Sequence, residues 1–86
     1  MGWTALKVEW TSKARKEFRN LDSVARRRVD AAIQHFAGTG EGDIKKVQGT
    51  TDEFRMRVGG YRVAFKIDWN RLVMTILHVG TRGDFY

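Results

Sequence analysis

Apolar and polar residues alternate near the start of the chain, in the segment ALKVEW at residues 5–10. Leu6, Val8 and Trp10 fall on one side of an extended backbone, and the two charged residues between them fall on the other. This period of two is typical of a half-buried strand. We therefore predict a strand over residues 5–10.

The period then changes to that of a helix. Ala14, Phe18 and Leu21 recur at helical spacing, while the basic residues between them point elsewhere. Ser12 precedes this series and offers a side-chain oxygen that can cap a helix N-terminus. We predict a short amphipathic helix that begins at Ser12.

A second, longer helix is predicted after the break at Asp22-Ser23, which offers another N-cap. The residues that follow form one apolar helix face, made of Ala25, Val29, Ala32, Ile33 and Phe36. The helix should end at the glycines of AGTGEGD, residues 37–43, because glycine readily adopts the conformations of C-caps and loops.

From residue 53 onward the period returns to two. Phe54, Met56 and Val58 share one face, and the same face continues after Gly59-Gly60 with Tyr61, Val63, Phe65 and Ile67. These two runs predict a hairpin. After a turn at residues 68–70, the segment RLVMTILHV at 71–79 is apolar on both sides, which predicts a third consecutive strand in the centre of the sheet.

The predicted order of elements is β-α-α-β-β-β, which is an α+β arrangement in two layers. We expect a four-stranded mixed or antiparallel sheet with both helices on one face. The chain of 86 residues is long enough for a single core, and it has no proline-rich linker or repeat, so we expect one domain over residues 1–86.

Composition adds a strong positive charge to this picture. The net charge of +6 favours an acidic partner such as nucleic acid, an anionic protein or a lipid surface. The absence of cysteine excludes disulfides and zinc-thiolate sites, and the acidic residues have no metal-binding spacing, so we expect no metal and no small-molecule cofactor. The chain has no signal peptide and no membrane-length apolar run, and we expect a cytoplasmic protein with no membrane partner.

Three arginines of the hairpin would lie together if the helices cover its apolar face. Arg55, Arg57 and Arg62 would then occupy the opposite face, where arginine side chains can make bidentate, permanently charged contacts to phosphate oxygens. The alternative is that they are solvated residues that discourage aggregation between sheets. The run Arg26, Arg27 and Arg28 is typical of a solvated helix face, and it would also add affinity for a phosphate backbone.

Two segments carry a resemblance to a known family, KKVQGTTDEFRMRVGGYRVAFKID at residues 45–68 and LHVGTRGDFY at residues 77–86. They resemble the RelE/ParE superfamily of bacterial toxins from type II toxin-antitoxin systems, and above all its RelE-type ribosome-dependent messenger-RNA endonucleases. The resemblance implies a RelE-like fold and a metal-independent endoribonuclease. It also implies a cognate antitoxin and the ribosome, with its messenger and ribosomal RNA, as partners.

The resemblance also implies roles for the hairpin arginines. Arg55 and Arg57 match two basic strand positions that contact the scissile region of the RNA, and Arg62 matches the residue that stabilises the phosphate in the transition state. RelE-type enzymes commonly have lysine at the positions of Arg55 and Arg57. Arginine is effectively never deprotonated, so this difference argues against a general-base role for either residue.

Further roles follow for residues on either side of the hairpin. Arg82 matches an arginine that stabilises or protonates the leaving group, and Tyr86 matches a tyrosine that stacks on a base of the codon. Lys45 and Lys46 match a basic stretch that helps to hold ribosomal RNA.

His78 is the obvious rival for proton transfer. By parity it belongs with Met74 and Ile76, just before Val79-Gly80, and it could face either layer. A lone histidine on an apolar strand is more often structural than catalytic, and we interpret it as structural.

Two other functions stay open at this point. A ParE-like relative would keep the fold and inhibit DNA gyrase without being a nuclease, and a basic RNA-binding module would have no catalytic activity. The presence of Arg62, Arg82 and Tyr86 together favours the nuclease, because ParE-type relatives generally lack the full set.

Overall fold

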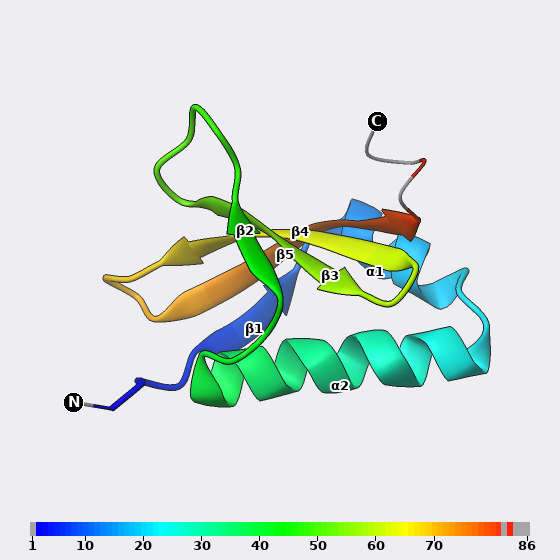
Figure 1. Cartoon of the computed structure of the whole chain (residues 1–86), viewed down its shortest axis with the longest axis horizontal. Coiled ribbons are helices and arrows are strands. Elements are labelled where there is room, and N and C mark those ends of the chain that lie inside the picture. Colours follow the sequence, from blue (N-terminus) through cyan, green and yellow to red (C-terminus); the bar gives the residue numbers. More distant parts are fainter. Residues whose placement is uncertain (1, 82, 84–86) are drawn as a thin grey trace.

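The computed structural model describes residues 2–81 and residue 83, which form two helices and a five-stranded sheet (Figure 1). In chain order the elements are β1 (Lys7–Trp10), α1 (Ser12–Arg19), α2 (Ser23–Thr39), β2 (Ile44–Lys46), β3 (Glu53–Val58), β4 (Tyr61–Asp68) and β5 (Val73–Thr81). The α+β class predicted from the sequence is confirmed. Within these residues no helix is both long and apolar enough to cross a membrane.

The sheet has the strand order β1-β5-β4-β3-β2 and is mixed, because β1 runs parallel to β5 and the other neighbours are antiparallel. The prediction of four strands was wrong, since β2 adds a fifth strand that pairs with β3. This strand has three residues, of which Ile44 alone is apolar, so no alternation marks it in the sequence. The central position predicted for the last strand is confirmed by its place between β1 and β4.

Side-chain caps set the starts of both helices. Thr11 caps α1, and its Oγ1 accepts a hydrogen bond from the backbone N–H of Ala14 at 3.1 Å. The prediction of Ser12 as the cap was therefore wrong by one residue, because Ser12 already has the helical conformation. Asp22 caps α2 through a 2.8 Å bond from the N–H of Ala25, as the sequence predicted.

The end of α2 depends on a glycine. Gly40 has a left-handed backbone with φ of 77°, and its N–H donates to the carbonyl of Phe36. The ring of Trp3 lies directly over Gly40, so a Cβ at this position would clash with it. Both the conformation and the close contact therefore require glycine here.

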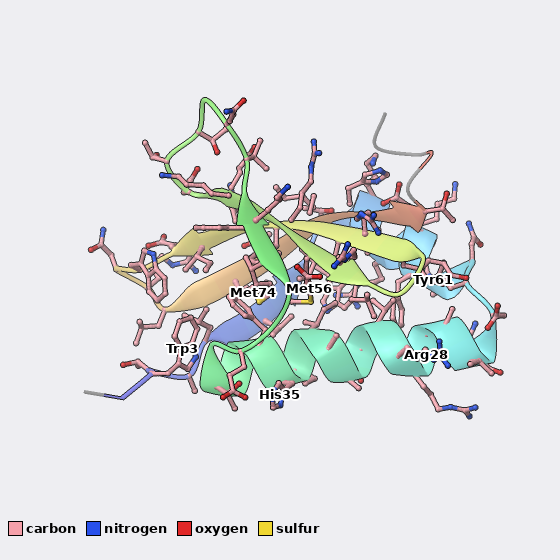
Figure 2. The ribbon with its side chains drawn as sticks, in the orientation of Figure 1. Trp3, Arg28, His35, Met56, Tyr61 and Met74 are labelled. Carbon is pink, nitrogen blue, oxygen red and sulfur yellow. The ribbon has the colours of Figure 1, made fainter. Side chains whose placement is uncertain are left out.

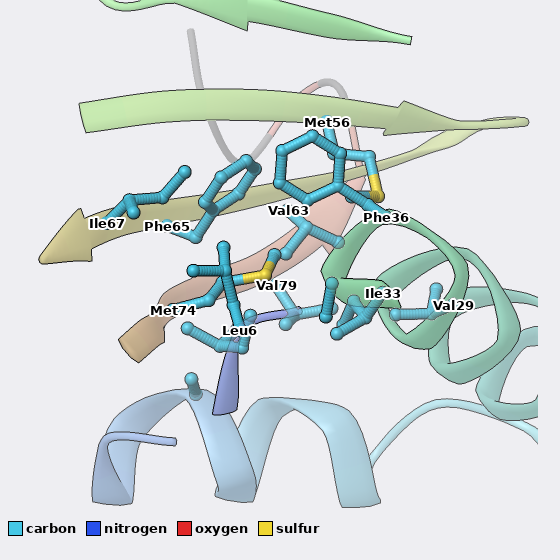
Figure 3. Packing of buried hydrophobic residues seen from close by; sticks show 13 residues of the cluster. Leu6, Val29, Ile33, Phe36, Met56, Val63, Phe65, Ile67, Met74 and Val79 are labelled. Carbon is cyan, nitrogen blue, oxygen red and sulfur yellow. The ribbon is translucent and has the colours of Figure 1, made fainter. Parts of the chain in front are cut away.

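The core lies between one face of the sheet and the two helices (Figure 3). Residues of both helices and of the strands belong to one buried cluster, which includes Ala14 from α1, Val29 and Ile33 from α2, and Met56, Val63, Phe65, Met74 and Ile76 from the sheet. Burial of each large side chain contributes roughly 1.5–3 kcal/mol to stability. Because β3 and β4 turn these residues inward, Arg55 and Arg62 lie on the opposite face.

A bulge in β5 changes which side chains of that strand face the core. Phe65 pairs with Ile76, but the preceding residue, Ala64, pairs with His78, so Leu77 is an extra residue in β5. Val79 is consequently buried in the core at 3% exposure, and His78 lies on the face of Ala64. Parity along the strand placed His78 with Ile76, and the bulge is the reason that it does not lie there.

Candidate nucleic-acid interface

A groove of about 580 Å³ lies over the end of the sheet formed by β2, β3 and β4. Its walls are formed by Asp43, Lys45, Lys46, Val47, Gln48, Arg55, Arg57 and Arg62. Five of these residues are basic and one is acidic, so the groove is strongly positive. Figure 1 shows the loop between β2 and β3 rising above the sheet, whereas α2 runs below it.

Pairing between strands brings four of the cations together. Arg57 lies directly opposite Arg62 across the hairpin, and Lys45 of β2 lies directly opposite Arg55. Like charges in such positions destabilise a sheet, typically by a few tenths of a kcal/mol to about 1 kcal/mol per pair. A polyanion in the groove would relieve this repulsion, which makes the arrangement suitable for a phosphate backbone.

The sequence predicted three arginines together on one face of the hairpin. The structure shows that their surroundings differ. Arg57 forms an ion pair with Asp43, in which Nη2 and Nε lie 2.6 and 2.7 Å from Oδ2. Arg62 is half-buried and donates from Nη1 to the carbonyl of Tyr61 at 3.1 Å. Arg57 is thus partly neutralised within the protein. Sequence reasoning missed Asp43 because it lies fourteen positions from Arg57 and only the pairing of β2 brings them together.

The run of arginines on α2 does not join this groove. Arg26 donates from Nη1 to the carbonyl of Leu21 at 2.6 Å and to that of Arg19 at 3.3 Å, so it satisfies carbonyls near the end of α1. Arg27 and Arg28 are exposed. Figure 2 shows Arg28 on α2, below the sheet in this view. Any RNA contact of these residues would therefore involve a different side of the protein.

A second polar cluster lies where α1 meets β5. Glu17 accepts a hydrogen bond from the backbone N–H of Val79 at 3.0 Å through Oε1, and its Oε2 lies 2.8 Å from Nδ1 of His78. Lys13 places Nζ 3.0 Å from the same Oε2 and 2.8 Å from Nδ1. Burial raises the pKa of Glu17, but the hydrogen bonds from Val79, His78 and Lys13 together lower that pKa below its ordinary value.

Two residues expected at the site, Arg82 and Tyr86, lie outside the described residues. Over residues 2–81 and 83, no group of three or more His, Cys, Asp or Glu side chains could hold a metal ion.

Comparison with known families decides the identity of the chain. Residues 8–86 match the family described as the ParE toxin of the type II toxin-antitoxin system parDE. The chain belongs to the ParE toxin family. It is therefore a type II toxin of the RelE/ParE superfamily, as the resemblance of its sequence implied.

Solved structures of RelE toxins share the fold of this ParE-family toxin. A chain of the archaeal RelE-RelB complex from Pyrococcus horikoshii is 26% identical, with a TM-score of 0.79 over 93% of this toxin and 98% of that chain. A chain of the RelBE2 complex from Mycobacterium tuberculosis is 22% identical, with a TM-score of 0.81 over 98% and 100%. The isolated Escherichia coli RelE toxin is 22% identical, with a TM-score of 0.78 over 90% and 84%. Comparison with curated protein sequences gave no match.

Proposed function

We propose that this toxin is a ribosome-dependent endoribonuclease that cuts messenger RNA in the ribosomal A site and so inhibits translation. The observation that carries the proposal is the basic groove, in which Lys45, Arg55 and Arg62 gather on a sheet face outside the core. The shape and charge of the groove suit a single strand of RNA. The protein also has the fold of RelE toxins.

The chemistry of RNA cleavage explains why a ribosome would be needed. Attack by the 2′-hydroxyl requires that this oxygen lies in line with the phosphorus and that charge on the phosphorane is compensated. Arg55 and Arg62 can supply the charge but cannot accept a proton. Such a site is slow on flexible RNA, so an A site that holds the message in line would supply the missing alignment.

We also propose a cognate antitoxin whose acidic segment binds the same groove. The Pyrococcus horikoshii and Mycobacterium tuberculosis neighbours are both toxin-antitoxin complexes. An acidic peptide and RNA would compete because they use the same positive charge. Coexpression with the neighbouring reading frame should relieve growth arrest and copurify a small protein, and failure of both would remove this part of the proposal.

The test of the nuclease is to map the 5′ ends of messages after brief induction of the toxin. Cuts at fixed positions within codons of the reading frame are expected, because the A site presents one codon at a time. The Arg62→Ala variant, induced to the same level, should give no such ends. Intact translated messages during growth arrest would contradict the proposal.

A second candidate is inhibition of DNA gyrase without nuclease activity. The matched family carries the name of the ParE toxin, and this observation favours the second candidate. The same induced cells distinguish the two functions, because a gyrase inhibitor would leave messages intact and produce DNA breaks trapped on gyrase. A basic RNA-binding module without catalytic activity would produce neither product.

A further inference from the structure

The groove over β2, β3 and β4 has cations at regular intervals along its strands. Arg57 and Arg62 pair near the turn of the hairpin. Arg55, two residues back along β3, pairs with Lys45 of β2. Two residues of a strand span about 7 Å. Two pairs of cations therefore follow one another along β3, at a spacing of about 7 Å.

Two uncharged residues line the groove at its other end. Among the described residues that form its walls, only Val47 and Gln48 carry no charge. Val47 comes directly after β2, and its N–H donates to the carbonyl of Glu53 at 3.0 Å. It therefore lies about 7 Å beyond the pair of Lys45 and Arg55. The groove thus places a half-buried valine and an exposed amide next to cations that suit phosphate.

A tight turn fixes the backbone of Gln48. Thr50 donates from its N–H to the carbonyl of Val47 at 3.3 Å, and its Oγ1 donates to the same carbonyl at 2.8 Å. Gly49 has a φ of 81°, the left-handed value that a type II turn requires at its third residue. Gln48 is the second residue of this turn, so its Cα is held in place beside the groove.

The side chain of Gln48 is available for a ligand. It is exposed and forms no hydrogen bond with another residue that the structure describes. Its amide both donates and accepts hydrogen bonds, whereas the arginines and lysines of the groove only donate. Gln48 can therefore match a nucleobase edge that has a donor beside an acceptor.

We propose that Gln48 is a specificity-determining residue that reads an adenine of the message, next to phosphates held by Arg55 and Arg62. The role rests on the proposed nuclease function, since the message must lie in the groove. Val47 offers an apolar surface on which the flat face of the base can lie. The bases of single-stranded RNA are exposed to such contacts, because they are not paired.

The pattern of donors and acceptors favours adenine over the other bases. Adenine presents the donor N6 beside the acceptor N7, and a glutamine amide binds this pair with two hydrogen bonds. Guanine presents two acceptors at the same edge, so the amide oxygen would face an acceptor. Cytosine presents only a donor at this edge and uracil only an acceptor, so each would make a single bond.

The test is single-turnover cleavage of messages that differ only in the codon held in the ribosomal A site, with each base placed in turn at each codon position. The wild type should prefer adenine at one position by about 5–150-fold, the effect of one bidentate pair. Gln48→Ala should remove this preference and leave the cut in the same place. Gln48→Glu, whose carboxylate only accepts, should favour cytosine at that position through its N4 amino group.

The chain offers two matched controls. Gln34→Ala removes a glutamine that is exposed on α2 outside the groove, and Thr51→Ala changes an exposed residue of the same loop that does not line the groove. Both variants should keep the base preference of the wild type. Thermal melts of all four variants should match that of the wild type, because each change is at an exposed position.

A wild-type toxin that cleaves without preference for adenine, or a Gln48→Ala variant that keeps the preference, would overturn the role of Gln48 and leave the nuclease standing. A wild-type toxin that cleaves no message on ribosomes would instead overturn the nuclease itself.

Discussion

Arg62 illustrates how a single side chain can serve binding while it contributes little to the free energy of unfolding. It lies opposite Arg57 and its guanidinium contacts only backbone carbonyls of Gly59 and Tyr61 among the hydrogen bonds observed within the described residues. Its charge is therefore opposed by a like charge and not by an acid. Glu17 shows the converse case, because its carboxylate is held by both the backbone and neighbouring side chains.

Replacement of Arg62 by alanine should separate catalysis from stability. Removal of like-charge repulsion without loss of core packing should change the free energy of unfolding by less than about 0.5 kcal/mol. Loss of a donor for the phosphorane should lower the cleavage rate by about 10²–10³-fold. Thermal melts and single-turnover cleavage measure the two effects. Arg71→Ala, an exposed arginine outside the groove, is the control and should keep full activity. Loss of folding in Arg62→Ala would refute this separation.

Asp43 should lower the affinity of the groove for RNA. Asp43→Asn removes the acidic residue of the groove and releases Arg57 for phosphate contact, so affinity for single-stranded RNA should increase. One further phosphate contact should steepen the slope of log K against log salt by about 0.7. Stability should change little because the ion pair is exposed. A salt titration of RNA binding measures this, with Asp52→Asn as the control, and an unchanged slope would show that Arg57 contacts no phosphate.

Glu17 should make folding sensitive to acid. The pKa of Glu17 is lowered in the folded protein, so its contribution to stability is present above the ordinary value near 4.5 and is lost as pH falls through the folded value. Denaturant unfolding of wild type and Glu17→Gln should therefore differ at neutral pH and converge at acidic pH. A difference that is constant across this range would contradict the assigned hydrogen bonds. Glu9→Gln is the control.

At the level of helices and strands, sequence periodicity predicts most of the fold and fails where the signal is absent. The hairpin of β3 and β4 alternates clearly, and the faces of Met56 and Arg55 follow from it. The short strand β2 has one apolar residue and no alternation. The bulge at Leu77 occurs in a strand that is apolar on both sides, so parity could not reveal it. The pairing of Glu17 with His78 spans 61 positions and has no local signal.

The cap of α1 gives a direct test at this level. Thr11→Ala should lower the free energy of unfolding by about 1 kcal/mol, because the N–H of Ala14 loses its acceptor. Ser12→Ala should have a much smaller effect, since Ser12 is inside the helix. Chemical denaturation of the two variants measures the difference. Equal losses of unfolding free energy in the two variants would contradict the assignment of Thr11 as the cap.

At the scale of the whole protein, which has a net charge of +6, groups of cations lie on at least two sides. The groove over β2, β3 and β4 gathers one set of cations, and Arg27 and Arg28 on α2 belong to another. Arg55, Arg57 and Arg62 form part of the walls of this groove, which is the surface where chemistry is proposed. The α2 residues can add only general attraction to polyanions, so their removal should weaken binding without changing the position of a cut.

The most direct measurement is cleavage of a defined message by the purified toxin, with and without a ribosome that presents one codon in its A site. We expect a single cut within that codon on the ribosome, no comparable cut in the same RNA alone, and loss of the cut with Arg62→Ala. A message that stays intact on the ribosome, or one that is cut equally well without it, would contradict a ribosome-dependent nuclease.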